Sequence, residues 1–401
     1  MGGVEMSEWV RYKLNEISTL SNGINFDKSA YASGVKLIGV SDFKDRLYPN
    51  YDSLQEVDSK VVKSGDYLEM GDIVFVRSNG NKELVGRCMM INRETPVTYS
   101  GFCIKLHLKD KKSFDPVFFN YLFRTRQFKK SMTGTAVGAN IQNLSQSRLG
   151  SCEVCVPSIE MQNAIATILS RYDSLIENYQ KQIKLLEETA QRLYKEWFVD
   201  LRFPGHENTK IVDGVPEGWE KKKVGDLIAK SQRTKQVPAN EYLKTGSIPV
   251  IDQSRNYIAG YTNDYECLVN VTTPYIVFGD HTRVLKYIPF SFAKGADGTQ
   301  LIMSNDLDRM PQSLFYNSLI NIDLSNYSYA RHFKYLKEEE ISVPISDVSM
   351  KYDELVSKYY QSIQNNREQI RLLTEARDRL LPKLMSAEIN VTKVSHPLRW
   401  H

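Results

Sequence analysis

The chain has 401 residues, of which 41% are hydrophobic and 25% charged, and its formal net charge is +4. This composition is ordinary for a globular protein, and the length suffices for about two or three domains. No apolar run approaches the roughly 18 residues of a membrane span, so we expect no membrane partner. Residues 1–10 lack the basic and apolar regions of a signal peptide. The mildly basic charge permits nucleic-acid binding without arguing for it.

The five cysteines are too few and too scattered for a disulfide framework, which favours a reducing cytoplasm as the location. Cys152-Glu-Val-Cys155 is the only C-x-x-C motif, and a zinc site would need a second pair of ligands. Its surroundings are typical of a strand, where positions i and i+3 face opposite sides. We therefore predict a structural, metal-free role for these two cysteines.

In chain order, two globular segments alternate with two long helical patterns. Each globular segment has short β-branched and aromatic runs broken by Gly, Asn and Asp, with a helix late in it, at 116–130 and 311–321. Pro204-Gly205 and Pro216 indicate a linker between the first helix and the second globular segment. The predicted segments are 1–157 (globular), 158–203 (helix), 204–217 (linker), 218–344 (globular), 345–391 (helix) and 392–401 (tail).

The helical segments form an internal repeat, because 156–193 aligns without a gap on 343–380 at an offset of 187. Apolar residues alternate at spacings of four and three over five heptads in each copy. One such helix alone would be an ordinary amphipathic core helix, but two matched helices favour an intramolecular coiled coil. Asn366 and Arg377 interrupt the second seam and are expected to fix its register. The seam residues that we expect to form the spacer and a partner's docking site are Ile176, Ile183, Leu186, Leu193, Trp197, Ile363, Ile370, Leu373 and Leu380.

Four further leucines widen the apolar stripe of these helices, so each helix is expected to contact more than one neighbour. They are Leu175, Leu185, Leu355 and Leu372.

The repeat extends more faintly into the globular segments. Trp9 resembles Trp219 at an offset of 210, and Ile73-Val-Phe75 recurs as Ile276-Val-Phe278. The drift of the offset from 210 to 187 indicates that the globular segments differ in length while the helices are constant.

Recognisable catalytic motifs are missing from the sequence. It has no phosphate-binding loop of the Gly-x-x-x-x-Gly-Lys-Ser/Thr type, no Gly-x-Gly-x-x-Gly after a strand, and no Asn/Asp-Pro-Pro-aromatic tetrapeptide. Asp42-Phe-Lys44 and Asp58-Ser-Lys60 fit half of a nuclease pattern, which is short enough to arise by chance. The sequence thus favours binding over catalysis.

Polar and basic loops follow corresponding elements of the two globular segments, and loops of this kind often carry function. Asn, Gln and Arg pair with the edges of adenine and guanine, and Lys and Arg neutralise phosphates. The candidate DNA-binding residues of the first segment are Arg77, Asn79, Lys82, Arg124, Asn140, Gln142 and Asn143. Those of the second segment are His281, Arg283, Lys294, Tyr329, Arg331, His332 and Lys334.

At this point the chain resembles the specificity (S) subunit of type I restriction–modification systems, over nearly its whole length. The specific motifs are Leu193-Tyr-Lys-Glu-Trp-Phe-Val-Asp-Leu-Arg-Phe-Pro-Gly-His206 and Leu380-Leu-Pro-Lys-Leu-Met-Ser-Ala-Glu388, which close the two helical regions. The entry Val156-Pro-Ser-Ile-Glu-Met-Gln162 resembles the start of the family's first spacer helix. Residues 278–282 and 329–334 are similar to segments of some of its recognition domains.

The resemblance implies an α+β fold, in which two globular α/β target-recognition domains alternate with two long helices. The helices pair as an antiparallel intramolecular coiled coil, and the whole is pseudo-two-fold. In these terms 1–157 and 218–344 are recognition domains, whereas 158–203 and 345–391 are conserved spacer helices.

The resemblance also implies a non-catalytic chain that reads a split, asymmetric sequence in double-stranded DNA. Two modification (M) subunits would dock on the spacer and methylate adenine at N6, and restriction subunits would join for translocation and cleavage. S-adenosylmethionine, ATP and Mg would belong to those partners, and this chain is expected to bind no cofactor and no metal. Two alternatives stay open from the residues alone: a coiled-coil scaffold without DNA specificity, and a stand-alone nuclease with an unrecognised site.

Overall fold

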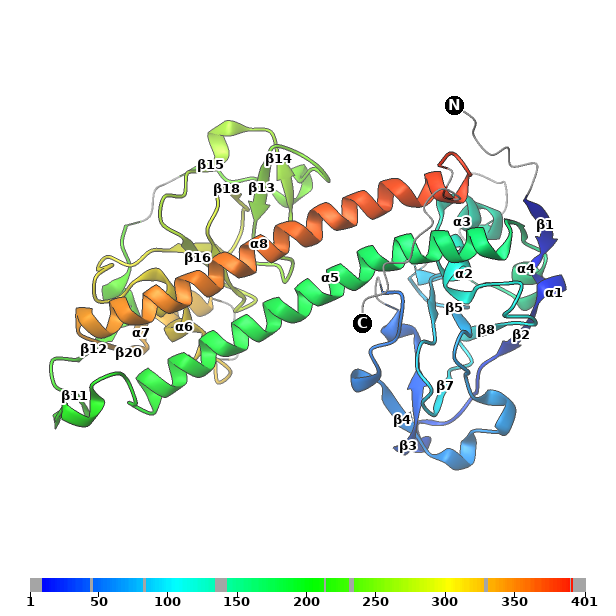
Figure 1. Ribbon diagram of the computed structural model, residues 1–401. Helices are drawn as coiled ribbons and strands as arrows, with labels where there is room; N and C mark the ends of the chain where they lie inside the picture. The colour runs from blue at the N-terminus through cyan, green and yellow to red at the C-terminus, as the bar shows by residue number, and fades with distance from the viewer. Residues whose placement is uncertain are drawn as a thin grey trace. The chain divides into compact units, whose positions relative to one another are not determined.

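The computed structural model describes residues 9–43, 46–81, 84–133, 143–212, 214–230, 234–327, 331–389 and 391. Its contacts divide the chain into two compact units. Unit 1 comprises residues 1–175 and 372–401, and unit 2 comprises residues 176–371. Each unit thus combines one globular domain with one end of each long helix (Figure 1).

Within its described residues, the globular domain of unit 1 contains three small sheets, and strand and helix side chains form its core. The largest sheet is antiparallel, in the order β2 (Ser18–Asn22), β8 (Cys103–Leu108), β5 (Ile73–Val76) and β6 (Cys88–Met90). A second has the order β4 (Gln55–Val57), β3 (Tyr31–Ile38) and β7 (Val97–Tyr99), with β3 and β7 parallel. The third pairs β1 (Val10–Lys13) with β9 (Glu153–Val156).

Short helices complete this domain. They are α1 (Leu14–Ile17), α2 (Pro116–Leu122), α3 (Arg126–Thr133) and α4 (Gln146–Gly150). The single helix predicted over 116–130 is therefore wrong, because the chain breaks between α2 and α3. Thr125 explains the break: its hydroxyl donates to the carbonyl of Leu122 at 2.7 Å and accepts the amide N–H of Phe128 at 3.2 Å. A side chain that accepts an amide three residues ahead begins a new helix.

In unit 1 the beginning of α5 (Ile159–Tyr194) and the end of α8 (Ser346–Met385) pack on this domain. Leu169 of α5 and Leu384 of α8 are buried in the same hydrophobic core as Phe118 of α2. Arg377 ion-pairs with Asp173, and the same carboxylate accepts a hydrogen bond from the hydroxyl of Tyr121. The polar residue that interrupts the second seam is thus paired across the helices, as expected for a residue that fixes register.

Unit 2 repeats this plan with different strand lengths. The sheet order β17 (Leu285–Ile288), β16 (Tyr275–Gly279), β19 (Thr299–Ile302) matches β6, β5 and β8 of unit 1. A second sheet has the order β14 (Gly260–Thr262), β13 (Ile248–Ile251), β18 (Phe292–Lys294) and β15 (Leu268–Val269), and here β13 and β18 are parallel. The pair β12 (Glu220–Lys223) and β20 (Glu340–Val343) corresponds to β1 and β9. The helices of this domain are α6 (Gln312–Ile320) and α7 (His332–Glu338).

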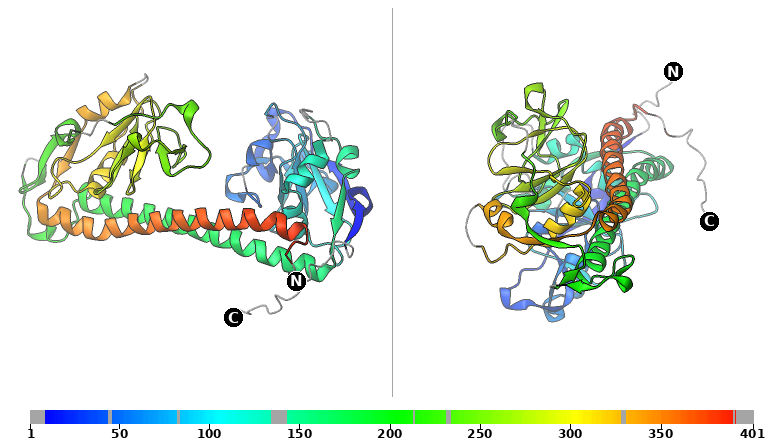
Figure 2. Two further views of the ribbon diagram at one scale, coloured as in Figure 1. Left: turned by 90° about the horizontal axis from the view of Figure 1, so that it is seen from above. Right: turned by 90° about the vertical axis from the view of Figure 1, so that its left-hand side faces the viewer.

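In unit 2 the end of α5 and the beginning of α8 run side by side and antiparallel (Figures 1 and 2). The Tyr352 hydroxyl donates to the carbonyl of Ala190 at 3.2 Å, and Asn366 Nδ2 donates to Gln182 Oε1 at 3.2 Å. Partner numbers rise on α8 as they fall on α5, which defines the antiparallel direction. Asn366 is therefore hydrogen-bonded within the seam that it interrupts.

The end of α5 continues as one π-helical turn, Lys195–Val199, and aromatic rings lock it onto the second domain. Phe198 packs edge-on against Tyr352 with ring centroids 5.0 Å apart, and Trp219 lies 4.9 Å from Phe203. Aromatic contacts of this kind add about 0.5–1.5 kcal/mol each beyond their buried area. The following segment, predicted as a linker, contains a small hairpin of β10 (Ile211–Val212) and β11 (Val215–Pro216).

The five cysteines are free thiols. Cys155 lies on β9 opposite Arg11, and the Cys152 thiol donates to the carbonyl of Arg148 at 3.4 Å. Within the described ranges, no helix is both long and apolar enough to cross a membrane.

Candidate nucleic-acid interface

The same hydrogen bond recurs in both domains and fixes a pair of loops. β5 and β16 are each the middle strand among their matched partners. The N–H of Arg77, just after β5, donates to the carbonyl of Phe102 at 2.8 Å. The N–H of Asp280, just after β16, donates to the carbonyl of Gly298 at 2.7 Å. The two domains therefore present different side chains on one backbone scaffold.

We define the first loop cluster as residues 77–81, 100–102 and 143. Ser78 forms an isolated antiparallel bridge with Asn143, and the carbonyl of Arg77 accepts the N–H of Leu144 at 2.8 Å. Arg77 and Asn79 are half-buried, and Asn143 is exposed. The fold thus brings together three of the seven residues proposed for the first domain.

Arg124 is placed differently from these three residues. Its guanidinium donates to the carbonyl of Cys88 at 3.0 Å and also to the carbonyl of Arg46. Both acceptors are backbone carbonyls of the same domain, so the guanidinium of Arg124 links parts of this domain to one another. The remaining candidates Lys82, Asn140 and Gln142 lie outside the described residues, as does Tyr329 of the second domain.

We define the second loop cluster as residues 253, 279–284, 297–298 and 331–334. Gln253 joins its parts, because its side-chain Oε1 accepts the N–H of His281 at 3.1 Å and its Nε2 donates to the carbonyl of Asp297 at 3.0 Å. The Thr282 hydroxyl donates to the carbonyl of Gln253 at 2.6 Å. Both polar atoms of this glutamine side chain serve the backbone, so its role is to position the neighbouring loops.

Arg283 and His332 form the centre of this cluster. Arg283 is exposed and has a φ of +59°, a strained conformation for a residue other than glycine. Its Nε donates to His332 Nε2 at 3.2 Å, and its Nη2 donates to the carbonyl of Tyr327 at 3.2 Å. His332 is only 4% exposed. Burial and the nearby Arg283 charge lower the pKa of His332, which favours the neutral ring, the form that accepts this hydrogen bond.

Arg331, His332 and Lys334 were predicted to lie in a polar and basic loop, but the chain becomes helical at His332, where α7 begins. Asp280 holds that start, because its Oδ1 accepts the N–H of Phe333 at 2.8 Å and its carbonyl accepts the N–H of His332 at 3.0 Å. Arg331 and Lys334 are exposed on this edge of the cluster. Lys294 lies at the end of β18, where burial lowers its pKa.

Sequence reasoning missed three residues of these clusters or their borders. Gln253 is a positioning residue, and Asn25 lies against Gly101 beside the first cluster. Phe102 is 62% exposed at the centre of the first cluster. An isolated Asn, Gln or Phe carries no motif, and only the folded chain shows that these residues border the loops.

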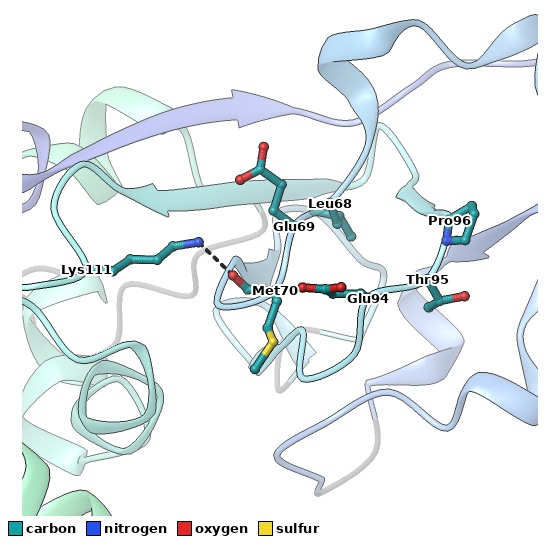
Figure 3. A pocket seen from close by; sticks show the side chains of 7 residues that line it. All are labelled: Leu68, Glu69, Met70, Glu94, Thr95, Pro96 and Lys111. Carbon is teal, nitrogen blue, oxygen red and sulfur yellow. Dashed lines mark hydrogen bonds between the residues drawn. The ribbon is translucent and has the colours of Figure 1, made fainter.

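The opposite end of β5 lies beside a hollow that is lined by two acidic side chains. Figure 3 shows a hollow there, lined by Glu69, Glu94 and Met70, in which Lys111 Nζ donates to the Met70 carbonyl at 2.7 Å. Two carboxylates make this end unsuitable for a phosphate backbone. Among the residues that the structure describes, no group of His, Cys, Asp and Glu side chains is arranged to hold a metal ion.

The nine residues predicted for the spacer are buried or half-buried. Ile183, Leu186 and Leu193 pack against the core of unit 2 together with Ile363, and Leu380 packs against the core of unit 1. The four leucines that widen the stripe are different, with exposures of 46% (Leu175), 61% (Leu185), 41% (Leu355) and 44% (Leu372).

Comparison with known proteins gives a consistent result. Residues 6–188 match the family described as the type I restriction modification DNA specificity domain. The chain is 29% identical over 303 residues to the type I restriction enzyme MjaIX specificity subunit of Methanocaldococcus jannaschii, which covers 68% of this chain and 69% of that relative. It is 22% identical over 192 residues to the EcoKI specificity subunit of Escherichia coli, which covers 46% of this chain and 41% of the relative.

A crystal structure of the type I restriction–modification S subunit from M. genitalium has the same fold, with a TM-score of 0.60. Its sequence identity is 17%, over 94% of this chain and 96% of that chain. At this identity the likeness shows the fold alone.

Paired domains that present polar and basic loops on one scaffold are typical of a protein that reads DNA. Residues 6–188 thus match the type I restriction modification DNA specificity domain, and the chain is similar to the specificity subunits of type I restriction enzymes. A specificity subunit is the component that recognises the DNA target, and it is not an enzyme itself.

Proposed function

We propose that this chain reads a bipartite, asymmetric target in double-stranded DNA, one half with each domain. In the proposal two M subunits dock on the spacer helices and methylate adenine at N6, and restriction subunits join them for cleavage. S-adenosylmethionine, ATP and Mg belong to those partners. The matched hydrogen bonds from Arg77 to Phe102 and from Asp280 to Gly298 carry the proposal, because one scaffold displays two different sets of side chains.

The side chains on each cluster suit base reading. Arg77, Asn79 and Asn143 of the first cluster are of the types that pair with guanine and adenine edges in the major groove. The second cluster offers Arg283 and Arg331, with the exposed Lys334 beside them for phosphate contact. Since the two sets differ, the two half-sites are expected to differ.

The exposed leucines support docking of M subunits. Leu185 of α5 and Leu372 of α8 are the same position of the 187-residue repeat, and both remain exposed while the seam residues are covered. Two matched apolar sites on charged helices fit two copies of one partner.

We also place the chain in the cytoplasm, where DNA and a reducing environment occur together. The free state of all five cysteines supports this location.

The first experiment is methylome sequencing of a host with and without this chain, which yields the modified motif directly. Arg331→Ala should then change the preferred bases in one half-site only, whereas Asn143→Ala should change the other half-site. His332→Ala should affect the same half-site as Arg331→Ala, because His332 positions Arg283. Equal weakening on all sequences would assign these residues to phosphate contact. Methylation or cleavage by the purified chain alone would refute the assignment.

A further inference from the structure

Phe102 is a large apolar side chain that lies outside the hydrophobic core of its domain. It lies in the turn between β7 and β8 and is 62% exposed, whereas Phe118, Phe119 and Phe123 of the same domain are fully buried. Among the large hydrophobic residues in the described ranges, only Tyr265 is more exposed.

The turn that carries Phe102 is held by hydrogen bonds on every side. The carbonyl of Phe102 accepts the N–H groups of Arg77 and Ser78, at 2.8 and 3.3 Å. On the other side, the N–H of Gly101 donates to the carbonyl of Ile24 at 2.7 Å. With its carbonyl used inside the domain, the residue has a fixed backbone, and its exposed ring extends from a fixed point of the surface.

Gly101 shows how tightly this turn is packed. A Cβ atom at this position would lie 2.0 Å from Oδ1 of Asn25 and 3.3 Å from the carbonyl oxygen of Ile24. Only glycine fits here without moving the exposed Asn25. The backbone of the turn therefore lies directly against the polar side chain of Asn25.

The surroundings of Phe102 indicate what it contacts. Its neighbours in the first loop cluster are Arg77, Asn79 and Asn143, and Asn25 borders the turn. These side chains suit the donors and acceptors of the major groove. The apolar group that the major groove presents is the C5-methyl of thymine, and phenylalanine is one of the side chains that pack against it.

We infer that Phe102 is a specificity-determining residue of the first half-site, which recognises a thymine by packing against its C5-methyl group. This inference rests on the proposed function and adds a base identity to it. The second domain has Gly298 at the corresponding position, so its half-site gains no thymine contact from this turn.

The test uses the full chain in complex with its M subunits and the target found by methylome sequencing. Each thymine of the first half-site is replaced in turn by deoxyuracil, which removes only the methyl group. We expect one replacement to weaken binding by the wild-type complex about fourfold, the equivalent of one buried methyl group. The Phe102→Ala complex should bind less tightly and lose that dependence, whereas Phe102→Leu should keep part of it.

Met70→Ala is the matched control, because Met70 is 56% exposed in the same domain but lies at the opposite end of β5 (Figure 3). It should keep the wild-type response to deoxyuracil. Equal thymine dependence in the wild-type and Phe102→Ala complexes would overturn the inference, as would a ring that unstacks bases, detected as increased 2-aminopurine fluorescence in the half-site. If the wild-type complex binds no bipartite target at all, the proposed function itself fails, and the two failures are thereby distinguished.

Discussion

His332 shows how a buried residue can control an exposed one. Its ring accepts the hydrogen bond from Arg283 Nε only while it is neutral, and this bond holds the guanidinium of Arg283, a residue with a left-handed backbone conformation. In this neutral form the buried Nδ1 carries the proton and has no partner among the described residues. Protonation of Nε2 would remove the acceptor and place a second positive charge beside the guanidinium. Arg283 is exposed, whereas His332, which accepts its hydrogen bond, is buried.

This arrangement predicts a pH dependence of stability. The pKa of His332 in the folded chain is below its usual 6.5, so the unfolded chain takes up a proton at a higher pH than the folded chain does. The contribution of His332 to stability is therefore fully present above about pH 6.5. It is lost as the pH falls through the window between the pKa of the unfolded chain and that of the folded chain. Unfolding by denaturant at pH 7.5 and pH 5.5 measures the loss.

His332→Gln provides the comparison for that measurement. Glutamine offers Arg283 an oxygen acceptor that does not titrate in this range, so the variant should lose less stability than the wild type between the two pH values. Identical losses would show that His332 does not contribute to the acid sensitivity.

At the scale of elements, α5 and α8 each have an inner face that packs against other parts of the chain and an outer face that is exposed to solvent. The seam residues are covered by cores or by the facing helix, whereas Leu185 and Leu372 are exposed at matched positions of the repeat. In the proposed function, each helix is both a structural spacer and a docking surface for an M subunit.

Leu185→Glu and Leu372→Glu should therefore leave the fold intact and weaken assembly. Each exposed change should alter the free energy of unfolding by no more than about 0.5 kcal/mol. We expect each single variant to lose one M subunit and the double variant to lose both, as measured by native mass spectrometry of the purified complex.

Met350→Glu serves as the control for these two variants. Met350 is 47% exposed on α8, but its counterpart in the repeat is Asn163, so the site is not present twice. This variant should retain both M subunits. Full assembly by the Leu185→Glu, Leu372→Glu double variant would exclude these leucines from the dock.

Some of these elements could be predicted from the sequence and others could not. Heptad spacing and the repeat predicted both long helices, since one apolar stripe over five heptads is a strong periodic signal. The break at Thr125 was missed because its hydroxyl caps α3 within an otherwise helical pattern. The role of Arg124 could not be foreseen either, because its acceptors lie 36 and 78 residues away in sequence. Contacts of that separation are fixed by the tertiary fold and leave no local pattern.

For the whole molecule, the repeat separates a constant part from a variable part. The helical copies keep one offset of 187, whereas the domains differ in length and in the side chains on their loop clusters. Each long helix continues through the boundary between the two contact units, since α5 spans residue 175 and α8 spans residue 371. The proposed function therefore assigns the gap between half-sites to the helices and the bases to the domains.

Paired insertions at that boundary test this assignment. Seven residues added after Leu175 and seven after Arg371 lengthen both helices by about 10 Å and restore the heptad seam. Since DNA rises about 3.4 Å per base pair, the preferred gap should grow by about three base pairs while both half-sites stay the same. Methylome sequencing of a host that carries the double insertion measures the gap. Insertion in one helix alone breaks the antiparallel register and should abolish methylation, whereas an unchanged gap in the double insertion would show that the helices do not set the spacing.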